Sequence, residues 1–287
     1  MKQFFIKLRG IISFFLAVIM SILGIYMPSR GTKDHIEDGE IRIMSFNVRC
    51  AEFLERGEIV PLLIGEYLPD SVGLQECTYD WYNTFRYLLP EYQFVGVGRD
   101  TGDISEDCGE ISAVLFRKDK YTLEDSGTFW LSETPDEVSR GWDAACNRIC
   151  TYVVLKDKET GETYAHVNTH LDHMGIFARK NGVDLVTQKA LSFDIPTVLT
   201  GDFNFKKDTD LYKQLVGSGL RDSQDLATET MTGKTYHGYR GGEEGKPIDY
   251  ILVNDKIESV SRYKIVREQI NDLYTSDHYP IYADITF

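Results

Sequence analysis

The stretch PTVLTGDFNF, residues 196–205, joins an apolar run to a polar end. The β-branched and apolar residues after its proline predict a strand buried in a sheet. Gly201 then leads into Asp202 and Asn204, which flank Phe203. Alternate residues of an extended chain point to opposite faces, so the acid and the amide share one face and Phe203 packs on the other. The stretch therefore predicts a strand that delivers two polar side chains to a site at its end; the alternative is that Asp202 only forms a turn.

Further apolar or alternating stretches predict strands along the whole chain, at residues 41–49, 71–76, 92–98, 111–117, 149–157, 163–171, 196–202, 248–254, 258–266 and 279–287. Helical patterns lie at residues 55–66, 78–89, 175–192 and 208–217. The segment KETGE joins two of the predicted strands as a hairpin. Strands interleaved with helices and hairpins predict a mixed α/β layered fold with much antiparallel pairing.

The N-terminus differs in composition from the rest of the chain. Three basic residues, Lys2, Lys7 and Arg9, precede an uncharged apolar run at residues 11–27. This pattern is typical of a signal sequence or an N-terminal membrane anchor, with a buried core helix as the alternative. We therefore expect an anchor or signal and a linker over residues 1–33, one globular domain over residues 34–287, and a membrane-anchored or secreted protein whose catalytic domain is extracytoplasmic.

The globular part is strongly acidic. No acid precedes Asp34, whereas five of the 31 basic residues do, so the chain from Asp34 onward carries 26 basic and 45 acidic residues. Such a surface repels long polyanions and lacks the basic footprint of a protein that grips duplex DNA. A local groove can differ from the average, so nucleic acid stays open as a partner. We expect a monomer.

Five cysteines, an odd number without a double CxxC pattern, do not indicate a zinc site. Buried thiols on strands are the favoured interpretation. A pair between Cys146 and Cys150 is left open.

Polar residues gather where predicted strands meet loops. Each has an ordinary explanation, since an Asn can satisfy a turn and a lone His is often structural. Their recurrence at the same kind of junction, where folds of this class place their sites, instead predicts one shared site. The residues are Asn47, Glu76, Asn168, His170, Asp202, Asn204, Asp249, Asp277 and His278.

These residue types suit one chemistry. The carboxylates and amides are hard oxygen ligands, and the chain has no HExxH pattern, so the implied ion is magnesium, with manganese as the alternative. His170 and His278 each lie within one or two residues of a carboxylate. The set fits metal-assisted attack of water on a phosphate.

The strings SFNVR, LQE, NTHLDH, GDFN, IDYIL and SDHYP, in this order over residues 41–287, resemble the endonuclease/exonuclease/phosphatase superfamily, the deoxyribonuclease-I-like metal-dependent phosphohydrolases. The resemblance implies a four-layer α/β sandwich of two packed mixed β-sheets flanked by helices, with the site at one end.

The resemblance also implies roles for these residues. Glu76 would be the principal metal ligand, with Asn47 helping to place the ion and the phosphate and Asp277 lying near the metal. Asp202 would orient or deprotonate the attacking water, with Asn204 beside it. Asp249 would hold His278 against the scissile phosphate, and His170 would be the second imidazole on that phosphate.

Softer signals extend the predicted substrate-binding set to Asn47, Asn168, Arg148, Arg179 and His237. Trp130, Trp142 and Arg148 are wall candidates or, equally, core and ion-pair residues. Arg179 either reaches a substrate phosphate or pairs with an acid. The Gly-rich segment 235–247 leads into Asp249 and predicts a pocket-shaping loop that acts through His237.

The sequence thus predicts a magnesium-dependent hydrolase that cleaves a phosphodiester or phosphomonoester of a small or lipid-derived substrate. The alternative is a nuclease acting on DNA or RNA. A third hypothesis is a catalytically silent protein that binds a phosphorylated ligand, which would be expected to lack Glu76, Asp202 or His278.

Overall fold

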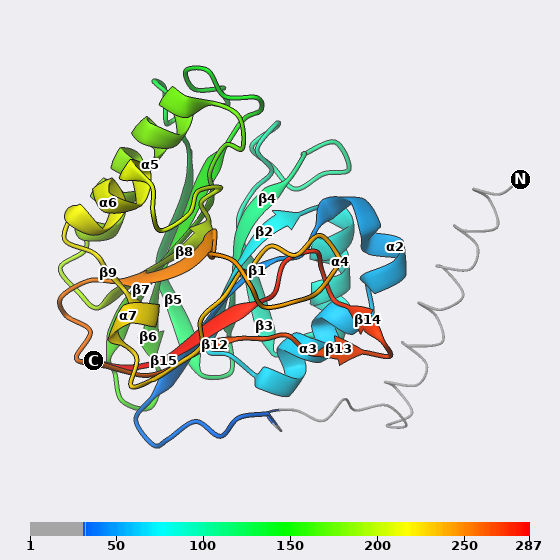
Figure 1. Ribbon diagram of the computed structural model, residues 1–287, viewed down its shortest axis with the longest axis vertical. Helices are drawn as coiled ribbons and strands as arrows, with labels where there is room; N and C mark the ends of the chain where they lie inside the picture. Colours follow the sequence, from blue (N-terminus) through cyan, green and yellow to red (C-terminus); the bar gives the residue numbers. More distant parts are fainter. Residues whose placement is uncertain (1–30, 32) are drawn as a thin grey trace, which may run out of the picture.

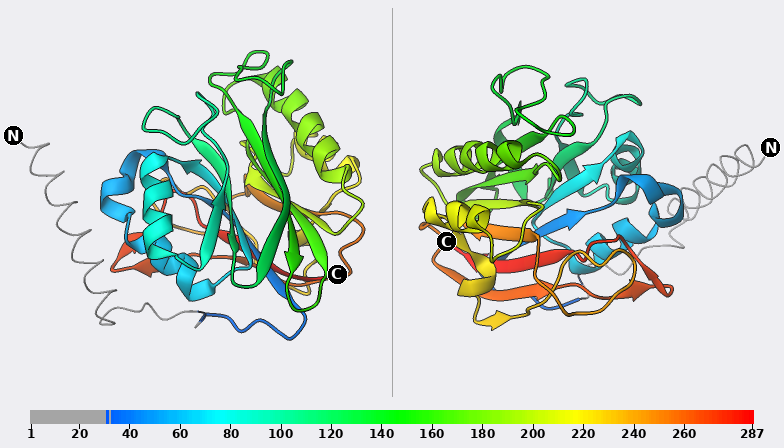
Figure 2. Two further views of the ribbon diagram at one scale, coloured as in Figure 1. Left: turned by 180° about the vertical axis from the view of Figure 1, so that it is seen from behind. Right: turned by 45° about the horizontal axis from the view of Figure 1, so that its top comes forward.

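Two mixed β-sheets pack face to face in the computed structural model, which describes residue 31 and residues 33–287 (Figure 1). The first sheet has seven strands in the order β10-β12-β15-β1-β2-β4-β3, and the second has six in the order β5-β6-β7-β8-β11-β9. Helices lie outside both sheets, and Figure 2 shows the layers from two further sides. The four-layer α/β sandwich that the sequence predicts is confirmed.

The strands of the first sheet are β1 (Ile41–Asn47), β2 (Ser71–Cys77), β3 (Tyr92–Val95), β4 (Ile111–Arg117), β10 (Glu229–Thr230), β12 (Ser259–Ile265) and β15 (Ile281–Thr286). Those of the second are β5 (Tyr121–Trp130), β6 (Ile149–Asp157), β7 (Thr163–His170), β8 (Thr197–Asp202), β9 (Arg221–Asp222) and β11 (Asp249–Val253). Parallel pairs, β1 with β2 and β7 with β8, lie among antiparallel ones. A short hairpin, β13 (Gln269–Ile270) and β14 (Leu273–Tyr274), lies apart.

Helices α3 (Ile59–Tyr67) and α4 (Tyr79–Leu88) pack on the outer face of the first sheet, where their apolar residues join its core. Helices α5 (Ile176–Leu191) and α6 (Asp210–Gly217) cover the second sheet in the same way. Short segments complete the set: η1 (Cys50–Glu52), α2 (Phe53–Arg56) and α7 (Ser223–Leu226). The four predicted helices therefore exist, and each buries apolar residues against a sheet.

Strand β5 is the principal element that the sequence analysis missed. Its stretch YTLEDSGTFW alternates poorly, and most of its residues are half-buried or exposed. It is an edge strand that pairs on one side only, with β6, and a register shift interrupts it between Leu123 and Asp125. Edge strands of this kind carry charges and bulges that hide the period of two. The predicted hairpin of β6 and β7 is confirmed.

Polar side chains cross the interface between the two sheets close to the site. Asn168 on β7 donates hydrogen bonds through Nδ2 to the carbonyls of Leu74 (2.8 Å) and Ala113 (2.9 Å) of the first sheet. Gly73 lies directly opposite, and a Cβ there would overlap the side chains of Thr200 and Asn168. The sheets approach closely here because this position is glycine.

His166 is the second buried polar link between the sheets. Its Nδ1 lies 2.8 Å from Ser71 Oγ, and its Nε2 lies 2.8 Å from Thr200 Oγ1. Tyr164 donates to Ser71, and Thr200 donates to Asn168 Oδ1, so the chain of donors has one consistent direction through a neutral ring protonated on Nε2. Burial lowers the pKa of His166 to about 3.

This histidine makes the stability of the protein depend on pH. In the unfolded chain His166 binds a proton below its ordinary pKa of 6.5, whereas in the folded chain it stays neutral down to about pH 3. Stability is therefore lost as the pH falls from 6.5 towards 3. His166→Gln should remove up to about 1.4 kcal/mol per pH unit from the slope. Urea unfolding of both proteins at several pH values between 4 and 7.5 measures it. His35→Gln, at an exposed histidine, is the control, and equal slopes for wild type and His166→Gln would refute the prediction.

The predicted signal or anchor lies outside the described residues, apart from the end of its linker. Gly31 and Lys33 donate backbone hydrogen bonds to the carbonyls of Gly65 and Glu66 on α3. Among the described residues, no helix combines the length and the apolar character that crossing a bilayer requires. The boundary between the N-terminal segment, residues 1–33, and the globular domain, residues 34–287, stays a prediction.

Candidate active site

A cavity of about 550 Å³ lies at the edge of the sandwich where strands of both sheets end. Strands β1, β2, β7 and β8 finish there, and their antiparallel neighbours β4, β6, β11 and β15 begin there, which brings residues far apart in sequence together. The lining residues are Arg49, Cys50, Glu76, Arg99, Glu110, Ala145, Cys146, Arg148, His170, His173, Asp202, Asn204, Tyr236, Ile248, Asp277 and His278.

Three residues of the lining have a left-handed backbone, although none is glycine. Their φ angles are 61° at Arg49, 55° at Glu76 and 54° at Asn204. Glu76 also lies in the register shift between Leu74 and Cys77 of β2. A left-handed conformation costs about 1–3 kcal/mol at such positions and persists where a site needs a side chain turned out of the strand. The strain here falls on the residues that face the cavity.

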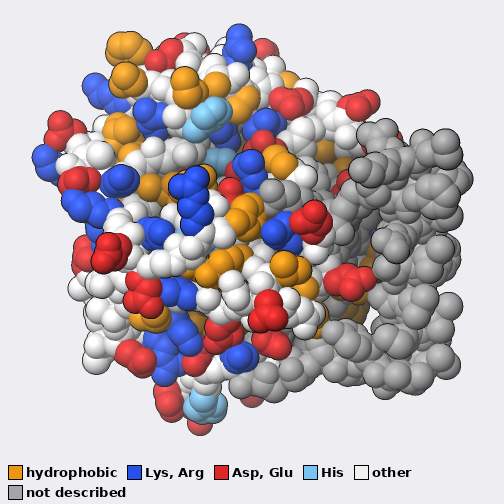
Figure 3. All heavy atoms as spheres, turned by 45° about the vertical axis from the view of Figure 1, so that its right-hand side comes forward, with side chains coloured by type: hydrophobic (Ala, Val, Ile, Leu, Met, Phe, Trp, Pro, Cys, Tyr) orange, Lys and Arg blue, Asp and Glu red, His pale blue; other side chains and the backbone are white. Residues whose placement is uncertain are grey.

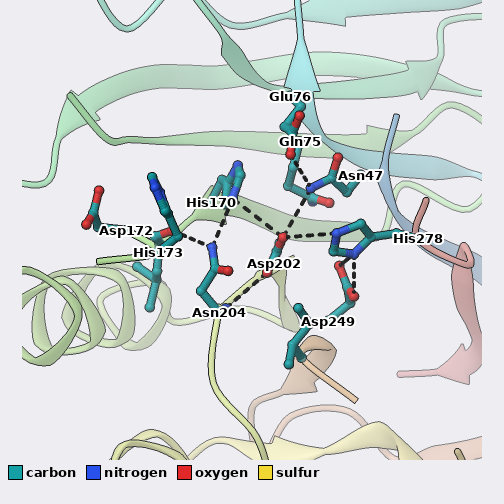
Figure 4. A network of polar contacts seen from close by, with 12 residues as sticks. Asn47, Gln75, Glu76, His170, Asp172, His173, Asp202, Asn204, Asp249 and His278 are labelled. Atoms are coloured by element: carbon teal, nitrogen blue, oxygen red, sulfur yellow. Dashed lines mark hydrogen bonds and ion pairs between the residues drawn. The ribbon is translucent and has the colours of Figure 1, made fainter. Parts of the chain in front are cut away.

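His278 lies between two carboxylates (Figure 4). Its Nδ1 is 2.9 Å from Asp249 Oδ2, and its Nε2 is 3.7 Å from Asp202 Oδ2. Asp249 and Asp202 face each other in the register of β11 and β8. Burial alone would lower the pKa of His278, but Asp249 and Asp202 outweigh it and raise that pKa to about 10. The raised pKa favours an imidazolium, and its Nε2–H faces Asp202 in the lining of the cavity.

Asp202 receives hydrogen bonds on both oxygens. Asn204 donates its backbone N–H to Oδ1 (3.0 Å), and Asn47 donates Nδ2 to Oδ2 (3.1 Å). Burial, together with Asp249, raises the pKa of Asp202. A buried carboxylate with a raised pKa is a suitable general base. Phe203 is fully buried, as the alternation of the opening stretch predicts.

His170 faces the same carboxylate from the end of β7. Asn204 donates Nδ2 to His170 Nε2 (3.1 Å), which puts the proton of the neutral ring on Nδ1. Burial and the nearby charge of Arg148 hold the pKa of His170 well below its usual range. Nδ1 is buried, has no hydrogen-bond partner among the described residues, and lies 3.8 Å from Glu110 Oε2. This orphaned donor can bind an oxygen of a substrate.

Glu76 and Asp277 form an acidic corner of the cavity with Arg49 between them. Arg49 Nη1 lies 3.3 Å from Glu76 Oε2, and Arg49 Nε lies 3.6 Å from Asp277 Oδ2. Burial would raise the pKa of Glu76, but hydrogen bonds from Cys50 N and Asn47 Nδ2 lower it, so Glu76 is ionised. The two carboxylates are hard oxygen ligands that already attract one cation, the guanidinium of Arg49. This corner therefore fits a divalent cation such as Mg²⁺.

Two cavity residues that the sequence analysis missed, Arg99 and Glu110, belong to an ion-pair network with Arg148 and Asp172. Arg99 Nη1 lies 2.7 Å from Glu110 Oε2, and the predicted residue Arg148 pairs through Nε with Asp172 Oδ2 (3.4 Å). Arg148 Nη2 also lies 3.1 Å from His173 Nδ1. Glu110 directly precedes a predicted strand and Arg99 directly follows one. The rule that found the other site residues would have found these two.

Four predicted substrate-binding residues do not line the cavity, and one of them, Asn47, is buried behind Glu76 and Asp202, to which it donates hydrogen bonds. Asn168 lies between the sheets, and Arg179 donates Nη1 to the carbonyl of Asp172 (2.9 Å). His237 is buried, with its ring centroid 3.9 Å from that of Tyr279. Their predicted contact with substrate stays a prediction. The loop of His237 does reach the cavity, but through its neighbour Tyr236.

The two predicted tryptophans do not line the cavity either. Trp130 donates Nε1 to the carbonyl of Arg99 (2.7 Å), so it supports the loop that carries Arg99. Trp142 is half-buried and donates its backbone N–H to Glu133. Cys146 and Cys150, whose pairing was left open, are free thiols, as are the other cysteines.

The arrangement combines parts that hydrolysis of a phosphoester requires. A carboxylate, Asp202, can accept a proton from water, and an imidazolium, His278, can donate to a phosphate oxygen. The corner of Glu76 and Asp277 can hold a cation against the same phosphate. These groups converge within one cavity.

Comparison with known proteins identifies a matching family. The profile described as Endonuclease/Exonuclease/phosphatase family matches residues 44–278. Human nocturnin is 23% identical over 279 residues, which cover 87% of this chain and 62% of that protein. The chain therefore spans less than two thirds of the curated relatives it matches.

Solved structures from Bacteroides share the fold over most of this chain. An endonuclease/exonuclease/phosphatase from Bacteroides vulgatus is 34% identical with a TM-score of 0.80, covering 86% of this chain and 99% of its own. A mannosyl-6-phosphatase from Bacteroides thetaiotaomicron is 31% identical with a TM-score of 0.79, covering 86% of this chain and 100% of its own.

Proposed function

This chain belongs to the Endonuclease/Exonuclease/phosphatase family, and we propose that it is a divalent-metal-dependent phosphatase that releases phosphate from a small phosphorylated sugar. Members of this family hydrolyse phosphoesters; the ion and the substrate are the finer parts of the proposal. The observation that carries it is the convergence of Asp202, the imidazolium of His278 and the acidic corner at Glu76 in one cavity.

The side chains divide the work of hydrolysis. Asp202, held by Asn204 and Asn47, accepts the proton of the attacking water. His278, held by Asp249, donates Nε2–H to a phosphate oxygen, and neutral His170 donates Nδ1–H to another. Each donor is fixed before the substrate binds, which lowers the cost of stabilising the charge that develops in the transition state.

Glu76 and Asp277 would hold the divalent cation, with Asn47 beside them. When bound, the ion supplies positive charge that neutralises phosphate oxygens. The corner needs this charge because the carboxylates of Glu76 and Asp277 face the single guanidinium of Arg49. Without an added cation, a phosphate dianion would meet an excess of negative charge at this corner.

Three observations support a small sugar phosphate over a polymer. The cavity is about 550 Å³, the size of a small-molecule site. The face shown in Figure 3 intermixes acidic and basic side chains instead of presenting a broad basic surface for a polyanion. The similar structure at 31% identity is a mannosyl-6-phosphatase.

We also propose that the reaction takes place outside the cytoplasm. The support is the sequence alone, in which three basic residues precede an apolar run at residues 11–27.

The test measures phosphate or product release by the full chain, with Mg²⁺ or with a chelator. The substrates are hexose 6-phosphates, glycerol 3-phosphate, a nucleoside monophosphate, a phospholipid, a diester reporter and an oligonucleotide. We expect metal-dependent release of phosphate from a hexose phosphate at the highest kcat/KM. Because the ion supplies the charge that neutralises phosphate oxygens, a chelator should abolish phosphate release.

Other outcomes would redirect the assignment. Preferred cleavage of the oligonucleotide would establish a nuclease and refute the phosphatase. Turnover that persists in the chelator would refute the metal dependence. Silence on all substrates by a folded protein that still binds a phosphorylated ligand would support the silent binding protein.

A further inference from the structure

We propose that Tyr236 and Ile248 form a subsite for the sugar ring of the substrate, a role that rests on the proposed phosphatase function. Both residues line the cavity, and Tyr236 lies in the Gly-rich loop before β11. The subsite would take a single, uncharged pyranose ring through the apolar face that its C–H groups form.

The exposure of Tyr236 is the first observation. Tyr236 is 51% exposed, although it belongs to the wall of a cavity. Its ring centroid lies 5.0 Å from that of His278, at an angle of 58°. His278 contacts the phosphate in the proposed reaction, so a group esterified to that phosphate on this side must pass over the phenol ring. An exposed aromatic ring beside a catalytic group offers an apolar body and a polar hydroxyl to a ligand.

The rigidity of this segment is the second observation. Thr235 Oγ1 accepts the backbone N–H groups of Ile248 (3.1 Å) and Asp249 (3.2 Å). The carbonyl of Thr235 accepts the N–H of Tyr279 (2.8 Å). On the other side of Tyr236, His237 donates its backbone N–H to the carbonyl of Asp277 (2.9 Å). The backbone on both sides of Tyr236 is thus tied to the segments that carry Asp249 and His278. The backbone that carries the Tyr236 ring is therefore held in place before a ligand arrives, which reduces the entropy cost of binding.

The part of the lining near Asp172 and His173, which lie across Asp202 from His278 in Figure 4, suits the hydroxyl groups of a sugar. Arg99 is paired with Glu110, and Arg148 with Asp172 and His173, so guanidinium donors alternate with carboxylate acceptors. Because each of these two arginines already faces a carboxylate, the wall offers hydrogen bonds more than net positive charge. An aromatic platform on one side and alternating donors and acceptors on the other favour a neutral polyhydroxylated ring over a second phosphate.

The experiment compares substrates with and without a ring in the full chain. For Tyr236→Ala, kcat/KM should fall about tenfold on a hexose 6-phosphate, because roughly 50–60 Å² of apolar contact is lost. The fall should appear mainly in KM, and the fall of kcat/KM on glycerol 3-phosphate should be much smaller. Tyr236→Phe keeps the ring and should stay within about threefold of wild type. Tyr87→Ala, at a tyrosine that is 57% exposed and outside the cavity, is the matched control.

Each other result counts against the subsite. Equal losses on both substrates would show that Tyr236 only supports His278, and no loss on the hexose phosphate would show that the ring goes elsewhere. A loss confined to a nucleoside monophosphate would assign the platform to a base instead of a sugar. If wild type hydrolyses no phosphomonoester, the proposed function itself fails, which is distinct from a working phosphatase that is indifferent to Tyr236.

Discussion

Asp202→Asn should lower kcat for phosphate release by about 10³–10⁴-fold while the protein stays folded. The amide has the shape of the carboxylate but cannot accept a proton from water. It also removes one of the two charges that keep His278 protonated, since Nε2 of His278 lies 3.7 Å from Asp202 Oδ2. Base and phosphate donor are therefore weakened together. Phosphate release under saturating substrate measures the effect.

The same substitution should leave stability nearly unchanged. Burial and Asp249 raise the pKa of Asp202, so the native environment disfavours its charged form, and a neutral residue removes that cost. Against this, an amide cannot accept from both Asn204 N and Asn47 Nδ2. We expect a melting temperature within about 4 °C of wild type. Asp255→Asn, at an exposed carboxylate, controls for loss of charge. Activity within tenfold of wild type in Asp202→Asn would refute the role of Asp202 as base.

Glu76→Gln should weaken the binding of Mg²⁺ or Mn²⁺ by at least about 100-fold, more than the loss of a residue that only supports a ligand. Glu76 is ionised, and glutamine removes its charge while keeping its length. Asp277 alone would then face Arg49 and the ion. Calorimetric titration of Mn²⁺ into the full chain measures binding directly, and phosphate release across a Mg²⁺ series measures its consequence.

A matched control separates this site from general acidity. Glu244→Gln changes an exposed acid in the Gly-rich loop and should bind the ion like wild type. Unchanged binding by Glu76→Gln would move the ion to another group of ligands. Two such groups of side chains lie close together among the described residues: Asp202 with Asp249 and His278, and Cys146 with Asp172 and His173.

Much of the fold and site was predictable because one local rule applied repeatedly. Apolar runs marked the strands, and polar residues at their ends marked the site, as with Glu76, His170 and Asp202. The rule failed for β5, whose exposed edge position leaves no clear alternation. It was applied too narrowly for Arg99 and Glu110, which also flank predicted strands and line the cavity.

Side-chain direction was the part that local pattern could not supply. Asn168 follows the same rule as His170, yet it points between the sheets and binds the carbonyls of Leu74 and Ala113. Asn168 and His170 are two residues apart on β7 and share one face of the strand. That face lies against the other sheet at Asn168 and against the cavity at His170. The partner strand, not the sequence of β7, decides which.

Hydrophobic periodicity and polar residues at strand ends were enough to predict most strands and helices, the residue types of the site and their convergence at one edge. Which side chains face the cavity depends on contacts between segments that are distant in the sequence. The left-handed backbone at Glu76 and the tethering of Thr235 depend on hydrogen bonds and register shifts between distant segments. These long-range contacts bring Tyr236 into the wall and bury His237 behind it.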